Sequence, residues 1–150
     1  FDEKFNNDIS IRVDNTILEK NNHKYGMTCA WLTMVGADEI VMLIGSQSDT
    51  GHHIEINDIV GISSLANDQE DVALNFGDHH SSIDNKFLNQ KYYLDEGAIL
   101  IEGAKGQMKC QVFDIKRVRG NNEDFLIFVK VLKSKIDDSK KFLLRENMVD

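Results

Sequence analysis

The stretch from Lys24 to Val35 carries residue types suited to holding a flat aromatic ligand. It reads KYGMTCAWLTMV, so a glycine opens an apolar, β-prone run that also carries small hydroxyl and thiol side chains. An extended backbone can exchange hydrogen bonds with the edge of such a ligand, and small side chains let it come close. On composition alone, a buried strand with a tryptophan in the core is the simpler interpretation. The residues that would line the ligand are Gly26, Met27, Thr28, Cys29, Ala30, Trp31 and Thr33.

A second stretch, GSQSDT at 45–50, has the donors that a phosphate group needs. Backbone amides at a helix start and the hydroxyls of Ser and Thr can converge on one phosphate. The same residues also fit a plain N-capped helix. The spacing favours phosphate binding, because one predicted strand separates this stretch from the first. The candidate phosphate contacts are Ser46, Ser48 and Thr50.

Most of the elements that must position these stretches are strands. Two-residue alternation predicts a strand over 9–14, and the apolar run Ile40–Ile44 predicts a strand buried on both faces. Many strands with little helix indicate a mainly β fold that closes, or nearly closes, into a barrel. Imperfect alternation after residue 107 indicates a bulge. Further strands are predicted over 59–65, 98–102, 107–119 and 124–135.

Two short helices are predicted between the strands. Ser48 can cap one that runs through Ile56. Asn67 or Asp68 starts the other, whose inward residues are Val72, Ala73 and Phe76. The chain has no proline, so its turns fall to Gly, Asn and Asp. Turns are expected at 21–22, 120–123 and 137–138, and an irregular surface loop is expected over 77–92.

Length and charge exclude several classes of protein. A chain of 150 residues is expected to form a single domain over 1–150. The net charge of −8 argues against nucleic-acid binding, which needs clustered Lys and Arg. No apolar run approaches the roughly 20 residues that span a bilayer, so no membrane partner is expected. Cys29 and Cys110 lie far apart in the sequence, which argues against a disulfide framework. A reducing cytoplasm is therefore the expected compartment.

Metal and nucleophile chemistry find little support in the sequence. The histidine pairs 52–53 and 79–80 each place adjacent side chains on opposite faces of an extended chain, so no metal site is expected. Cys29 lies in the middle of a predicted strand, where a thiol is usually buried and inert. No dinucleotide-binding or Walker glycine motif occurs. The residues alone therefore assign no catalytic group.

The two stretches together resemble the flavin reductase-like family, the FMN-binding split barrels. Its Gly-Met-Thr-Ala-x-Trp strand is similar to residues 26–31, and its Ser-x-Thr loop is similar to residues 48–50. Thr33 also matches, and the resemblance extends from about Lys24 to Leu144. The chain departs from the family at four places: Cys29 replaces Ala, Ala30 replaces Asn or Ser, residues 51–53 replace a His-Glu pair, and residues 36–39 replace an Asp-Pro-Pro turn.

The resemblance implies a six-stranded split barrel with one or two short helices. It also implies a homodimer with FMN, less expectedly FAD, near the subunit interface. The activity implied is that of an FMN-dependent oxidoreductase, which passes electrons from NAD(P)H through the flavin to a flavin, metal or protein acceptor. A family loop that covers the exposed flavin face is loosely similar to residues 77–87. It would place His79, His80, Asp84, Lys86 and Phe87 on the substrate side.

Two other functions remain open at this point. One is a non-catalytic dimer that binds a flavin or another ligand on the same fold, which the divergence at residues 51–53 favours. The other is an interaction module without a cofactor, which would make both motifs coincidental.

Overall fold

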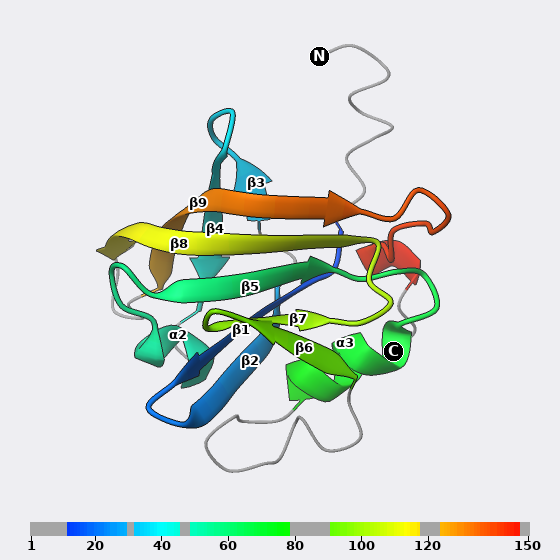
Figure 1. Cartoon of the computed structure of the whole chain (residues 1–150), viewed down its shortest axis with the longest axis horizontal. Helices are drawn as coiled ribbons and strands as arrows, with labels where there is room; N and C mark the ends of the chain where they lie inside the picture. The colour runs from blue at the N-terminus through cyan, green and yellow to red at the C-terminus, as the bar shows by residue number, and fades with distance from the viewer. Residues whose placement is uncertain (1–11, 30–31, 46–48, 79–90, 118–123, 148–150) are drawn as a thin grey trace.

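The computed structural model describes residues 12–29, 32–45, 49–78, 91–117 and 124–147 of the chain. Its strands all pair antiparallel in one sheet (Figure 1). The described strands are β1 (Asp14–Lys20), β2 (His23–Cys29), β3 (Leu32–Met34), β4 (Glu39–Ile44), β5 (Ile59–Ser64), β6 (Tyr92–Asp95), β7 (Ala98–Ile101), β8 (Gly106–Arg117) and β9 (Phe125–Ile136). The described helices are α2 (Asp49–His53), α3 (Glu70–Asp78) and the 3-10 helix η1 (Arg145–Asn147).

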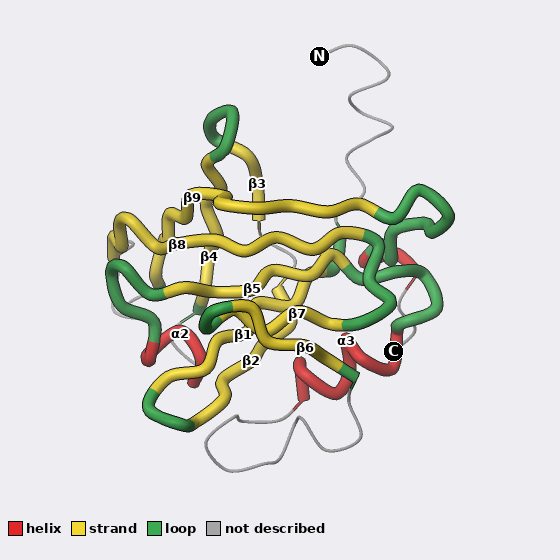
Figure 2. The backbone as a smooth tube through the Cα atoms, viewed as in Figure 1, coloured by secondary structure: helices red, strands yellow, loops and turns green. Residues whose placement is uncertain are grey.

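The sheet curls into a split barrel, as predicted. Its strand order is β3-β4-β9-β8-β5-β1-β7-β6, with β2 also paired to β1, and the sheet does not close on itself. Six of the nine described strands have six residues or more, namely β1, β2, β4, β5, β8 and β9. In Figure 2, β9, β8, β5 and β7 run across the view, and the β1–β2 hairpin and β4 cross them at a steep angle.

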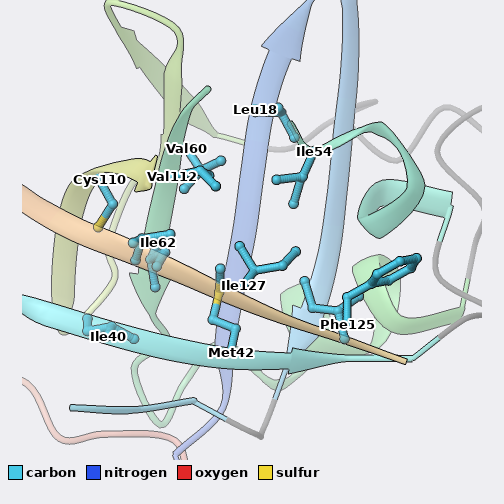
Figure 3. Close-up of a cluster of buried hydrophobic side chains, with 12 residues drawn as sticks. Leu18, Ile40, Met42, Ile54, Val60, Ile62, Cys110, Val112, Phe125 and Ile127 are labelled. Carbon is cyan, nitrogen blue, oxygen red and sulfur yellow. The ribbon is translucent and has the colours of Figure 1, made fainter. Parts of the chain in front are cut away.

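The barrel core lies on the inner face of the sheet. Side chains from β1, β4, β5, β8 and β9 converge there, and Ile62, Met42 and Ile127 are fully buried (Figure 3). A second apolar cluster lies on the other face of β1, where α3 covers the sheet. Ala73 and Phe76 are each 1% exposed, so the predicted inward face of this helix is confirmed.

Strand β4 differs from its prediction in one respect. Ile40, Met42 and Ile44 are buried in the barrel core, but Val41 is half-buried and Leu43 is 37% exposed. The expectation of burial on both faces was wrong, because the described helices pack elsewhere, α2 against β2 and α3 against β1 and β2. The outer face of β4 is therefore apolar and partly open.

The first hairpin has the turn that its sequence predicts. Asn21 and Asn22 both have positive φ, 53° and 63°, which is the backbone of the two-residue turn that joins twisted strands. The hairpin pairs β1 with β2 from Asp14 opposite Cys29 to Lys20 opposite His23. Most of the strand predicted over 9–14 lies outside the described residues. The strand that continues from it, β1, was not predicted.

The later strands and turns follow the sequence closely. Strands β5, β7, β8 and β9 lie where they were predicted, and β8 shifts register twice against β9, so the predicted bulge is confirmed. The turn after Asp137 also forms. The turn predicted at 120–123 and most of the loop predicted over 77–92 lie outside the described residues. Among the described helices, none is long and apolar enough to cross a membrane.

Candidate functional site

The fold brings the two chemically suggestive stretches together. The ring of Tyr25 on β2 stacks on the ring of His53 on α2, with centroids 4.1 Å apart and planes 17° from parallel. The predicted ring-binding strand therefore lies beside the helix that follows the predicted phosphate segment. Ala30, Trp31, Ser46 and Ser48 lie outside the described residues.

Lys20, the last residue of β1, holds the end of α2 in place. Its Nζ donates to the His53 carbonyl oxygen at 3.1 Å and to the Asp58 carboxylate at 2.9 Å, and it also pairs with Glu55. Burial opposes the charge on this amine, but hydrogen bonds and attraction from the two carboxylates outweigh it and raise the pKa of Lys20. The helix is thus fixed by one charged and one aromatic contact.

Gly26 has a packing role that the sequence did not suggest. A Cβ atom there would lie 2.9 Å from the Phe76 ring and 3.2 Å from Ile17, so α3 occupies the side-chain position. On that side the close approach comes from α3, whereas the sequence had suggested a ligand there. Met27, the next residue, is half-buried and packs against the barrel core.

Thr28 ties β2 to α3 through its hydroxyl. The Oγ1 atom lies 2.6 Å from the Ala73 carbonyl oxygen and 3.1 Å from Oδ1 of Asn15. A hydroxyl carries one proton, so it can donate to only one of these oxygens at a time. Asn15 is fully buried, and its Nδ2 has no hydrogen-bond partner in the part of the chain that the structure describes. The site thus includes a buried amide that is only partly satisfied.

The other described candidates vary in exposure. Cys29 is 4% exposed, with its Sγ 3.8 Å from the Leu43 carbonyl oxygen, which fits the expected packing role. Thr50 is 1% exposed near the start of α2. Thr33 is exposed on β3. The structure therefore buries Cys29 and Thr50, leaves Thr28 half-buried and places Thr33 at the surface.

A row of polar residues, most of them buried, crosses β2, β1 and β5, and most of it was missed in the sequence. The register pairs Asp14 with Cys29 and Ser64, and Asn15 with Thr28 and Ser63. Asp14, Asn15, Ser63 and Ser64 are each at most 6% exposed. We call the set Asp14, Asn15, Thr28, Cys29, Ser63 and Ser64 the polar row. One signal in the sequence could have revealed part of this row. Three polar residues, Asp14 to Thr16, come directly before the apolar pair Ile17 and Leu18, so one strand can contain both.

Asp14 is the titratable member of the polar row. It is 3% exposed, and Ser64 Oγ donates a hydrogen bond to its carboxylate at 2.5 Å. Burial raises the pKa of Asp14 to about 6, although the Ser64 hydrogen bond and the charge of Arg12 act in the opposite direction. A carboxyl group that changes charge near neutral pH thus lies next to the end of β2.

His52 and His53 lie on helix α2, not on the extended chain for which opposite directions were expected. His53 contacts Tyr25, whereas His52 meets the ring of Phe125 edge-on at 5.6 Å. No cluster of three or more potential metal ligands occurs among the described residues. The substrate-side candidates His79, His80, Asp84, Lys86 and Phe87 lie outside the described part of the chain.

Comparison with known proteins gives one family and many similar structures. The family model described as flavin reductase like domain matches residues 16–147. No curated protein sequence matches the chain. The NADH:FAD oxidoreductase SgcE6 of Streptomyces globisporus, solved with NAD and FAD fragments, is 20% identical with a TM-score of 0.76, covering 91% of this chain and 81% of that one.

Two further solved structures share the fold. A flavin reductase domain protein from Arthrobacter sp. FB24 has a TM-score of 0.79 at 16% identity, covering 99% of this chain and 93% of that one. An FMN-binding protein from Thermus thermophilus, with bound p-hydroxybenzaldehyde, has a TM-score of 0.75 at 14% identity, covering 86% and 73%. At these identities the structural likeness establishes the fold, and the family match extends over most of the sequence.

Proposed function

The chain belongs to the flavin reductase-like family of oxidoreductases, and we propose that it uses FMN to pass electrons from NAD(P)H to a flavin, a metal ion or a protein. The observation that carries this proposal is the stacking of Tyr25 on His53. It places the predicted ring-binding strand and the helix after the predicted phosphate segment side by side. A ligand with a flat ring and a phosphate tail needs both.

The described residues at the end of β2 fit a flavin ring. Cys29 is small and uncharged, and within the described residues the Asp14 carboxylate opposite it has one hydrogen-bond donor where it can accept several. A bound flavin supplies the hydride and electron chemistry. The protein residues bind and orient the ring and exclude water from its buried edge.

The choice of FMN over FAD rests on the segment before α2. Ser46, Ser48 and Thr50 offer hydroxyl donors for a single terminal phosphate, and the packing of α2 against β2 limits where that phosphate can lie. Among proteins of the same fold, one was solved with NAD and FAD fragments and another is named for binding FMN. The spectrum and chromatographic identity of the cofactor released from purified protein test the choice directly.

We also propose that the protein is a homodimer, with a second copy on the outer face of β4, β9 and β8. Val41 and Leu43 lie opposite Phe128 and Leu126 on that face, and Phe113 packs near Phe128 with ring centroids 6.1 Å apart. Leu43 is 37% and Phe113 is 44% exposed. A contiguous apolar surface of this kind is typical of a protein interface.

The burial of both cysteine thiols supports a proposal for the cellular compartment. Cys29 and Cys110 are both free and buried, and burial raises the pKa of the Cys110 thiol to about 12. Two inert thiols without a disulfide are typical of a reducing compartment, so we propose a cytoplasmic location.

A flavin-binding protein without turnover is the second candidate function. The Thermus thermophilus neighbour, which is named for binding FMN, shares the fold with a TM-score of 0.75. The two functions separate in two steps. Purified protein that carries flavin is yellow under either function, and NAD(P)H oxidation in air, followed by absorbance at 340 nm, then occurs only with the enzyme. Colourless protein that fails to take up added flavin would contradict both.

A further inference from the structure

Asp14 is a buried carboxylate with unfilled hydrogen-bonding capacity. It lies on the barrel face of β1 between Cys29 of β2 and Ser64 of β5, and it is 3% exposed. Within the described residues, the structure gives it one hydrogen bond, from Ser64 Oγ at 2.5 Å. An ionised carboxylate has about four acceptor positions, and a buried one is costly unless they are filled.

The charges around Asp14 do not compensate for its burial. Its neighbours on β2 and β5, Cys29 and Ser64, carry no formal charge, and among the described residues Arg12, two residues before β1, is the charged group that acts on it. Arg12 is exposed, and its guanidinium lies over the ring of Phe142 at 3.9 Å. Burial is the largest influence and raises the pKa of Asp14 to about 6. The ionised form would be stabilised by a further donor.

We propose that Asp14 is a ligand-binding residue, whose carboxylate accepts a hydrogen bond from an N–H or O–H group of the bound flavin. This inference rests on the proposed flavin site at the end of β2. The register places Asp14 directly opposite Cys29, the last described residue of the strand expected to line the ring. A flavin carries an imide N–H on its ring and hydroxyl groups on its ribityl chain, so it has the donors that Asp14 lacks.

This role predicts a coupling between pH and flavin affinity. A donor from the flavin stabilises the ionised carboxylate and lowers the pKa of Asp14 in the complex. By linkage, the flavin then binds more tightly to the ionised protein. Affinity should rise as the pH increases through about 6, the value for the free protein, and level off above it. Each unit of pKa lowering gives up to about a tenfold gain in affinity.

The test is a titration of riboflavin into the protein at pH values between 5 and 8, followed by flavin fluorescence. Riboflavin is the probe because FMN carries a phosphate whose second ionisation, near pH 6, would overlap with that of Asp14. The variants are Asp14→Asn and, as a matched control, Asp38→Asn. The side chain of Asp38 is 53% exposed, and its carboxylate lies 3.8 Å from Lys130 Nζ, away from the polar row.

Riboflavin affinity of the parent and of Asp38→Asn is expected to rise about fivefold or more from pH 5 to pH 8, and that of Asp14→Asn to stay flat. Asp14→Asn should fold, because it removes a buried charge and keeps the shape of the side chain. A second readout is the carboxyl carbon shift of Asp14 by NMR, whose titration midpoint should fall when riboflavin is added.

The outcomes separate this inference from the proposed function. If the parent binds riboflavin with the same pH profile as Asp14→Asn, or if the Asp14 midpoint is unchanged by riboflavin, the role of Asp14 is refuted and the flavin site stands. If the parent binds neither riboflavin nor FMN at any pH, both proposals are refuted.

Discussion

The backbone of Gly61 on β5 packs directly against that of Ile99 on β7. A Cβ atom on Gly61 would lie 2.1 Å from the Ile99 carbonyl oxygen and 2.7 Å from its carbonyl carbon. No change of rotamer can relieve such a contact, because the backbone fixes the position of a Cβ atom and the Ile99 atoms belong to the backbone. This contact packs β7 against β5 and positions Ile99, a member of the second apolar cluster.

Substitution of Gly61 by alanine should therefore be severely destabilising. We expect a loss of about 4 kcal/mol or more in the free energy of unfolding, or no folded protein at all. Gly36→Ala is the control, because the nearest atoms to its Cβ would belong to the side chain of Glu39, at 3.4 Å or more. Denaturant unfolding of both variants checks this. Equal stability of the two variants would mean that β7 does not pack against β5 as described.

Asp14→Asn should stabilise the free protein at neutral pH. The pKa of Asp14 in the folded state, about 6, lies above its value of 3.8 in the unfolded chain, so the folded state binds the proton more tightly. Parent stability then falls as pH rises from about 4 to 6 and stays low above that range. The variant should gain up to about 3 kcal/mol at pH 7 and almost nothing at pH 4.

Urea unfolding of parent and Asp14→Asn at several pH values measures this difference. A variant that is less stable than the parent at pH 7 would show that the Asp14 charge is compensated in the fold.

Cys29→Ala should keep flavin binding and NAD(P)H oxidation. The thiol is buried beside the Leu43 carbonyl oxygen, and its partner in the register is the acidic Asp14, whose charge opposes a thiolate. Removing one sulfur should cost about 1 kcal/mol of stability through a small cavity. Turnover with saturating FMN checks the role. A hundredfold loss of turnover with flavin still bound would show that the thiol takes part in the chemistry.

Leu43→Glu should weaken the proposed dimer. It places a charge in the middle of the exposed apolar face of β4, β9 and β8, where a second copy would bury it without a partner. Leu94→Glu is the control, because Leu94 is also exposed, at 53%, but lies on β6 at the far end of the sheet order. Sedimentation velocity at low concentration checks both. A parent that is monomeric with flavin bound would rule out the dimer.

Local patterns predicted much of the fold. Alternating or continuous apolar runs located β4, β5, β7, β8 and β9, and the acidic start and inward Phe76 located α3. Strand β1 was missed because Asp14, Asn15 and Thr16 have the polarity of a surface segment. Their burial depends on pairing with β2 and β5, and Ser64 lies 50 residues away from Asp14 in the sequence. The pairing register of β1 with β2 and β5 cannot be derived from a single sequence.

The candidate site could be predicted only in part, because some of its contacts also join segments distant in the sequence. The motifs at residues 26–33 and 46–50 are local, so they could be read directly. Two features of the site arise between segments that are distant in the chain. The ring of Phe76 requires a glycine at position 26, and Tyr25 stacks on His53. Spacing can suggest that two motifs serve one ligand, but it does not show which side chains join them.

The most direct test of the proposed flavin site compares FMN with riboflavin on Ser48→Ala/Thr50→Ala and the parent. Each hydroxyl is expected to form a charge-assisted hydrogen bond with the phosphate that contributes about 1.5–3 kcal/mol to the free energy of binding. The double variant should bind FMN more weakly by on the order of a hundredfold or more, with riboflavin affinity nearly unchanged. Fluorescence titration gives both dissociation constants. An FMN dissociation constant equal to that of the parent, or a parent that binds no FMN, would contradict the proposal.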